Sequence, residues 1–303
     1  MKKCILLLLM VLPSLLFSQQ IADTTYNPII QNPIYEHEQG SVIFIDEGHH
    51  NFHTKNGRYK AFSNLLERDG YKVIEYKGPF DEFELSKGKI LVISNALNKI
   101  NVDAWFLPNP SAFTKSEIAT LKKWVFEGGS LFLIADHMPM AGAATELAAA
   151  FEFEFTNGFV FGTVSKGAAI FNLKEKTLHE SIITQGRSKN ESVEQIATFT
   201  GQAFKIPPDA TPILTFDKNY INMLPDTAWV FNDKTKKHDV KGWSQGAYKK
   251  FGKGRIVVFG EAAMFTAQLA GPNQIRAGMN NAVAPENYQL LLNIIHWLDE
   301  KLE

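Results

Sequence analysis

The chain of 303 residues has a single cysteine, Cys4, which lies ahead of an N-terminal apolar run. That position argues against lipid attachment. After removal of a leader, no thiol would be left for disulfides, thiolate metal ligands or a cysteine nucleophile. An excess of basic charge is also missing, because 31 Lys and Arg face 32 Asp and Glu, giving a net charge of -1. Surfaces that bind nucleic acid are strongly basic, so we expect no DNA or RNA partner.

Long apolar runs are confined to the N-terminus. Residues 1–18 carry two lysines, an apolar run over 5–12 and Pro13, which predicts a secretory signal peptide. An uncleaved anchor helix is the alternative. No later segment reaches the roughly 20 apolar residues that span a bilayer. We therefore expect an exported protein, periplasmic or extracellular, with no membrane span after signal cleavage. It would have an extended lead-in over 19–40 and a single domain over 41–303.

Strand-like and helix-like segments alternate along the mature chain. Helical spacing is clearest after the capping box of Thr114 and Glu117 and in the last segment, which begins at Pro285. Strands that alternate with helices predict a doubly wound, mainly parallel α/β sheet. Aromatic, alternating segments after residue 151 indicate a β-rich insertion. The runs that resemble buried strands cover residues 41–46, 71–76, 90–95, 130–135 and 255–259.

Acidic and imidazole groups follow the first of these runs. Asp46 ends it, and His49 and His53 come next, four residues apart. Ligands of open α/β sheets bind at the carboxyl ends of the strands. Imidazoles with carboxylates are common ligands of zinc, so Asp46, His49 and His53 are predicted to bind one divalent metal ion such as zinc. Their spacing matches no established metal motif. In the alternative interpretation, Asp46 caps its own loop and the histidines are ordinary loop residues.

Two later runs end in similar groups. Asp136 and His137 follow residues 130–135, and Glu261 follows residues 255–259. We predict catalytic roles for these three residues in water-mediated hydrolysis, with or without a metal ion. The chain has no Gly-x-Ser-x-Gly elbow, so a serine nucleophile is disfavoured. Alternatively, Asp136 and Glu261 cap the helical turns that follow them.

Two further residues are predicted to contact a substrate. Asn95 ends the run at 90–95, and Trp105 lies in the long loop over 96–113. An aromatic ring in such a loop can stack on a sugar or a peptide, although aromatic residues more often fill cores. His296, on the last helical segment, is assigned no role.

The order of these motifs resembles the class I glutamine amidotransferase-like superfamily, and most closely its uncharacterised DUF4350 and gliding-motility, ABC-transporter-associated group. The resemblance implies a flavodoxin-like fold. In true amidotransferases the nucleophilic cysteine follows a strand at the position of residues 135–138. No cysteine is present there, so glutaminase activity is not implied. The segments that carry the resemblance are 46–50, 114–129, 131–137, 254–268 and 287–298.

Two functions stay open. The first is an exported, metal-dependent hydrolase of a glycan, peptide or other small polar substrate. It requires Asp46, His49 and Asp136 to lie close together. The second is a noncatalytic envelope binding or scaffold domain, which predicts a large exposed apolar or aromatic patch and no convergence of these strand-end residues. A small polar or carbohydrate ligand and an envelope protein are the partners expected.

Overall fold

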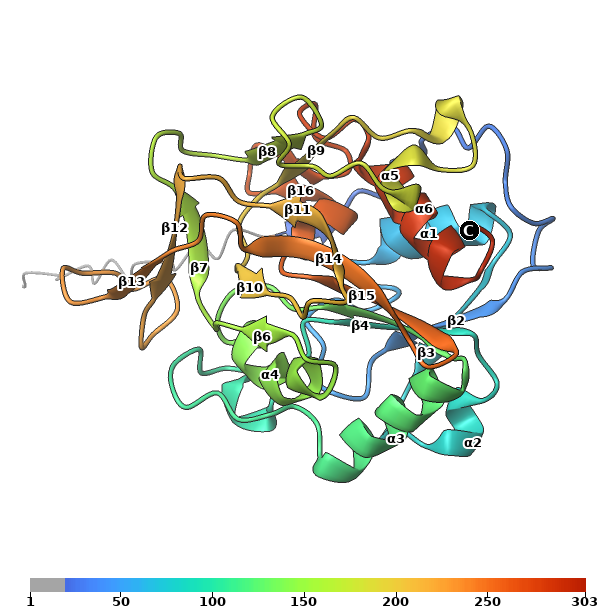
Figure 1. The fold of residues 1–303 in the computed structure, drawn as a ribbon, viewed down its shortest axis with the longest axis horizontal. Helices are drawn as coiled ribbons and strands as arrows, with labels where there is room; N and C mark the ends of the chain where they lie inside the picture. The colour runs from blue at the N-terminus through green and yellow to red at the C-terminus, as the bar shows by residue number, and fades with distance from the viewer. Residues whose placement is uncertain (1–19) are drawn as a thin grey trace, which may run out of the picture.

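A computed structural model describes residues 20–303, and the predicted signal peptide at 1–18 lies outside this range (Figure 1). Its centre is a nine-stranded sheet in the order β3-β2-β4-β5-β15-β14-β10-β6, with β11 added on β14. The strands of this sheet are β2 (Val42–Asp46), β3 (Lys72–Tyr76), β4 (Ile90–Ser94), β5 (Ser130–Ile134), β6 (Glu154–Phe155), β10 (Phe204–Lys205), β11 (Thr211–Thr215), β14 (Ser244–Phe251) and β15 (Gly254–Phe259).

The prediction of a doubly wound, mainly parallel sheet was wrong. The pairings that join β3, β2, β4, β5 and β15 are parallel. The nine other strand pairings in the described chain are antiparallel. Parallel neighbours need a crossover connection of a dozen or more residues, whereas antiparallel neighbours need only a turn. From residue 151 to 278 the chain forms twelve strands and a single short α-helix at Ile182–Gln185, so the fold is β-rich and mixed.

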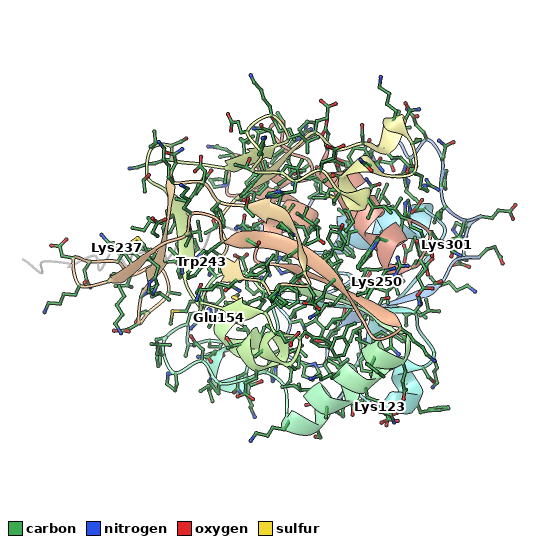
Figure 2. The ribbon with its side chains drawn as sticks, in the orientation of Figure 1. Lys123, Glu154, Lys237, Trp243, Lys250 and Lys301 are labelled. Carbon is green, nitrogen blue, oxygen red and sulfur yellow. The ribbon has the colours of Figure 1, made fainter. Side chains whose placement is uncertain are left out.

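Three smaller sheets complete the strands. The start of the predicted extended lead-in forms β1, which pairs antiparallel with β16. The β12–β13 hairpin projects from the body of the molecule, with Lys237 at its outer end (Figure 2), and every residue of β13 is exposed. The strands of these sheets are β1 (Gln20–Ala22), β16 (Ala267–Ala270) and β17 (Ile275–Gly278), then β7 (Phe159–Gly162), β12 (Tyr220–Leu224) and β13 (Lys236–Asp239), and finally β8 (Ala169–Asn172) and β9 (Gln195–Thr198).

Helices cover both faces of the parallel strands. Alternate residues of β2 are buried on opposite faces, with Ile43 and Ile45 on the side of α1 and α6, and Phe44 on the side of α3 and α4. This period of two is expected for a strand buried on both faces. The helices are α1 (Lys60–Arg68), α2 (Glu82–Leu85), α3 (Lys115–Glu127), α4 (Met140–Ala150), α5 (Ile182–Gln185) and α6 (Asn287–Leu298), with 3-10 turns at η1 (Lys99–Asn101), η2 (Lys189–Glu191) and η3 (Ala263–Phe265).

The capping box at the start of α3 is confirmed. The Thr114 hydroxyl accepts from the Glu117 amide at 3.3 Å, and Glu117 accepts from the Thr114 amide at 2.9 Å. Over residues 20–303, no helix combines the length and the apolar character needed to cross a bilayer.

Candidate functional site

Four polar residues lie where β2, β4, β5 and β15 end, at one edge of the parallel half of the sheet. We name Asp46, Asn95, Asp136 and Glu261 the strand-end rim. Asn95 is 1% exposed, and its side-chain oxygen accepts from the Asp136 amide at 2.8 Å. Asn95 therefore joins the ends of β4 and β5, and this buried position leaves little of it available to contact a substrate.

His49 sits beside the rim and bridges two carboxylates. Its Nδ1 lies 2.9 Å from Asp46 Oδ1, and its Nε2 lies 3.0 Å from Glu117 Oε1. Phe80 and Phe113 cover the ring, with centroids at 4.4 and 4.8 Å. Burial lowers the pKa of His49, but hydrogen bonds and charge from Asp46 and Glu117 outweigh burial and raise it. We name Asp46, His49 and Glu117 the His49 network.

Glu117 has a second role besides capping α3. Burial raises the pKa of its carboxyl, but hydrogen bonds from Thr114 and His49 outweigh burial and lower that pKa to about 2. The carboxylate thus satisfies the helix terminus and one imidazole nitrogen together. The sequence shows the capping box, but no local signal places His49 against it 68 residues away.

The structure does not gather the predicted metal ligands Asp46, His49 and His53 into one ligand group. Among the residues that the structure describes, no group of three His, Asp or Glu side chains is placed to hold a metal ion. Both ring nitrogens of His49 already face carboxylates, so neither lone pair is free for a metal. His53 is buried against Tyr59, and burial together with the charge of Arg58 lowers its pKa to about 3.

Glu261 is fully buried at the end of β15. Its Oε1 accepts from the Ala263 amide at 3.0 Å, and its Oε2 accepts from the Met264 amide at 2.7 Å. Burial and the nearby charge of Asp136 raise its pKa well above the usual range. A group with no exposed surface does not touch a substrate in this conformation. The geometry is that of a cap on η3.

His137 lies among aromatic rings just after Asp136. Its Nδ1 donates to the Met138 carbonyl at 2.7 Å, and its ring stacks on Phe159 with centroids 4.2 Å apart. The Trp229 and Trp105 rings lie with their centroids 4.8 and 6.2 Å from the His137 ring centroid. Its Nε2 is 4.0 Å from Asp136 Oδ1, too far for a hydrogen bond. The structure thus brings the predicted residues Trp105, Asp136 and His137 together. It adds Trp229, which is 51% exposed.

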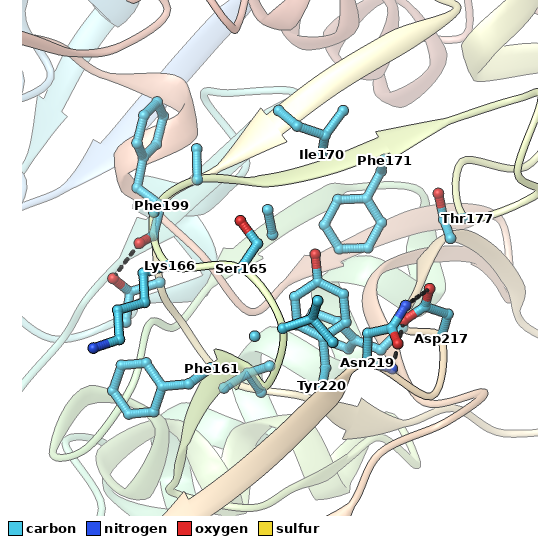
Figure 3. A pocket seen from close by; sticks show the side chains of 18 of the residues that line it. Phe161, Ser165, Lys166, Ile170, Phe171, Thr177, Phe199, Asp217, Asn219 and Tyr220 are labelled. Carbon is cyan, nitrogen blue, oxygen red and sulfur yellow. Dashed lines mark hydrogen bonds between the residues drawn. The ribbon is translucent and has the colours of Figure 1, made fainter.

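A cavity of about 550 Å³ lies off the rim between β7, β8 and β12 (Figure 3). Phe199 and Thr200 form its wall toward the rim. The next residue, Gly201, packs closely on the end of β15. A Cβ there would lie 2.1 Å from the Gly260 oxygen and 2.9 Å from the Glu261 Cβ, so only glycine fits between this wall and the rim. The sequence did not predict this cavity, since its aromatic residues follow the alternating pattern of ordinary core strands.

Replacing Glu261 by Gln is expected to flatten the pH dependence of stability. The raised pKa means that the folded state keeps a proton that the unfolded state releases above about pH 4.5, so stability falls as pH rises from that value. Glu261→Gln removes this slope. It also costs about 1–3 kcal/mol at low pH, because an NH₂ group then faces a backbone donor. Urea unfolding between pH 4.5 and 8 measures both effects, with Glu127→Gln, at an exposed position, as control. An unchanged slope would contradict the burial of a neutral Glu261.

Comparisons with known proteins support a fold and no family. No protein-family model matches the chain, and no curated protein does either. Among solved structures, the mmIFT52 N-terminal domain is 14% identical with a TM-score of 0.56, over 85% of this chain and 97% of that one. The cytoplasmic protein STM3548 from Salmonella typhimurium is 14% identical with a TM-score of 0.50, over 85% and 98%. A putative ThuA-like protein from Bacteroides uniformis is 10% identical with a TM-score of 0.45, over 91% and 96%.

The predicted membership of the class I glutamine amidotransferase-like superfamily, and of its DUF4350 group, was wrong. The ThuA-like structure is the link to that superfamily, and its similarity is too low to carry an argument. Of the segments behind the prediction, 46–50, 131–137 and 254–268 contain the ends of buried strands, whereas 114–129 and 287–298 form α3 and α6. Buried strands that end in polar turns occur wherever strand ends meet solvent-facing loops. They do not distinguish a doubly wound sheet from this mixed one. At such low identity the chain shares a fold with the mmIFT52 N-terminal domain and STM3548, and this likeness does not extend to function.

Proposed function

We propose that this protein is a noncatalytic, exported binding domain for a small polar ligand. The observation that carries the proposal is that the polar groups near the strand-end rim bond to one another, whereas the cavity is open to a ligand. The His49 network and Glu261 are consumed in internal hydrogen bonds. The cavity beyond Gly201 is instead open and lined by aromatic rings and hydroxyls. Pockets that bind small ligands commonly combine apolar walls with a few polar groups.

The export of the protein rests on the sequence of residues 1–18 alone. An envelope protein partner is compatible with a scaffold role, and the exposed side chains of Phe106, Trp229 and Val230 would offer apolar contact area. Recovery of the mature chain from the periplasm or medium, with N-terminal sequencing, tests the export step.

Hydrolysis without a metal ion is the second candidate function. It is favoured by one observation, the Asp136 carboxylate and the His137 Nε2 lying 4.0 Å apart beside Trp105 and Trp229. Catalytic hydrogen bonds are often long before a substrate is bound. Against it, the side chains of Asp136 and His137 are only 12% and 9% exposed, which leaves little room for a substrate and a water molecule.

Turnover distinguishes these two functions, and metal content tests the metal-dependent hydrolase that the sequence suggested. Untagged protein, incubated with Zn²⁺ and desalted, is expected to retain far less than one metal ion per chain. The His49→Ala, Asp136→Ala double variant should give the same value by elemental mass spectrometry. Chromogenic glycosides, esters and peptide anilides are expected to show no turnover above buffer. Stoichiometric metal that is lost in the double variant would overturn the proposal. So would turnover that Asp136→Asn abolishes and that Asp103→Asn, at an exposed position, leaves intact.

A further inference from the structure

The cavity between β7, β8 and β12 is walled by aromatic rings from four separate segments. Figure 3 places Phe161 and Phe199 toward one side, and Phe171 and Tyr220 toward the other. The Phe171 and Tyr220 rings are nearly parallel, at 16° and 6.4 Å between centroids, and Phe216 supports Tyr220 at 5.0 Å. The aromatic side of the cavity is therefore held by packing behind it, and its outermost ring is Tyr220, which is half-buried.

Neutral hydroxyl groups line the same space. Ser165 lies on an exposed loop between the two aromatic sides, and Tyr220 presents its phenol from β12 (Figure 3). Burial and the charges of Asp217 and Glu175 raise the pKa of Tyr220, so the phenol is a neutral donor at pH 7. Thr200 adds a third hydroxyl, which donates to the Phe199 carbonyl and can still accept. Neither the Ser165 nor the Tyr220 hydroxyl is hydrogen-bonded to another of the lining residues drawn in Figure 3.

The charges around the cavity disfavour an anionic ligand. Lys166 is the one cation in its lining and is exposed, whereas Asp217 and Glu175 are acidic. Asp217 already accepts from the Asn219 amide and side chain at 2.8 and 2.9 Å, so it is fixed in place. A phosphate or carboxylate ligand would meet two negative charges and one exposed positive charge, without the bidentate arginine that such groups favour.

We infer that this cavity binds a neutral saccharide of one or two rings, an inference that rests on the proposed binding function. The apolar face of a sugar ring would lie on the aromatic wall near Tyr220, and its hydroxyls would pair with Ser165, Thr200 and the Tyr220 phenol. Rigid aromatic surfaces supply contact area at low entropic cost, and fixed hydroxyls supply orientation. The volume of about 550 Å³ is in the range of small-ligand pockets.

Ligand-observed NMR on the purified protein tests this inference. The probes are maltose, cellobiose, lactose and N,N′-diacetylchitobiose, with phenylalanine dipeptides as apolar non-sugar probes and inorganic phosphate as the anionic probe. At least one disaccharide is expected to bind. Ser165→Trp should abolish this binding by filling the cavity from an exposed position, and Ser188→Trp, also at an exposed position but away from the cavity, should leave it unchanged. Tyr220→Phe should weaken it about 2- to 10-fold, the effect of one hydrogen bond.

Each other outcome overturns a defined part of the inference. Binding of the dipeptides or of phosphate alone, blocked by Ser165→Trp, would reject the saccharide and leave the binding domain standing. Saccharide binding that survives Ser165→Trp would reject this cavity as the site. If none of the probes binds wild-type protein, the saccharide assignment fails. The proposed noncatalytic function is judged separately by the metal and turnover measurements.

Discussion

His49→Ala is expected to lower the free energy of unfolding by about 3–5 kcal/mol near pH 5.5, because removing one partner of a buried ion pair leaves its charge uncompensated. The imidazole stands between Asp46, which is fully buried, and Glu117, which is 8% exposed. Asp46 would keep its bonds from the Gly48 amide and the Asn51 side chain. Glu117 would keep the hydrogen bonds that it accepts from the Thr114 hydroxyl and the Phe80 amide. Neither carboxylate would keep a cationic partner.

The pH dependence separates this effect from a loss of packing. The raised pKa of His49 gives a contribution that is full below the ordinary value of 6.5 and lost as pH rises through the folded-state pKa. The lowered pKa of Glu117 gives one that is full above 4.5 and lost as pH falls toward about 2. The difference between wild type and His49→Ala should therefore peak between about pH 4.5 and 6.5.

Urea unfolding at pH 3, 5.5 and 9 measures this profile. His37→Ala serves as the matched control, since His37 is exposed, and it should change stability by less than about 0.5 kcal/mol at each pH. A loss in His49→Ala that is equal at pH 5.5 and pH 9 would show that ring packing against Phe80 and Phe113, rather than charge, sustains the network.

The parallel half of the fold was accessible from the sequence because its signals are local. The apolar runs at 41–46 and 130–135 correspond to β2 and β5, and the capping box marks the start of α3. Strand ends that carry polar residues then had to share one edge, which is why Asp46, Asn95 and Asp136 do lie on neighbouring strands. These features follow from burial on both faces of a strand and from helix capping.

The antiparallel half and the contents of the site were not accessible in this way. β14 pairs with β15, β10 and β11, and only the first of these is a neighbour in sequence. Such pairings depend on packing between segments that are distant in sequence, and a single sequence carries no local signal of that packing. The same limit applies to the rim. A carboxylate at a strand end can cap a turn, as Glu261 does, or face solvent. Which of the two occurs depends on the segments, distant in sequence, that cover that strand end.

His296 shows how far a tertiary contact can change the role of a residue. No pattern in the sequence singles it out on α6, yet it is 1% exposed and its Nε2 lies 2.6 Å from Asp69 Oδ2, at the end of α1. Asp69 is fully buried, and its other oxygen accepts from the Ile34 amide at 2.9 Å. One carboxylate therefore joins the N-terminal segment, α1 and α6.

Asp69→Ala is accordingly expected to cost about 3–5 kcal/mol, because it leaves a buried imidazole nitrogen and a backbone amide without an acceptor. Asp69→Asn keeps an oxygen for one of the two donors and should cost less than Asp69→Ala. Urea unfolding of Asp69→Ala, His296→Ala and the double variant gives their coupling, which should be at least about 1 kcal/mol for groups in direct contact. Asp233→Ala, at an exposed carboxylate between β12 and β13, is the control. Single-variant losses that add without coupling would mean that α1 and α6 are held by apolar packing alone, with the ion pair contributing nothing to their association.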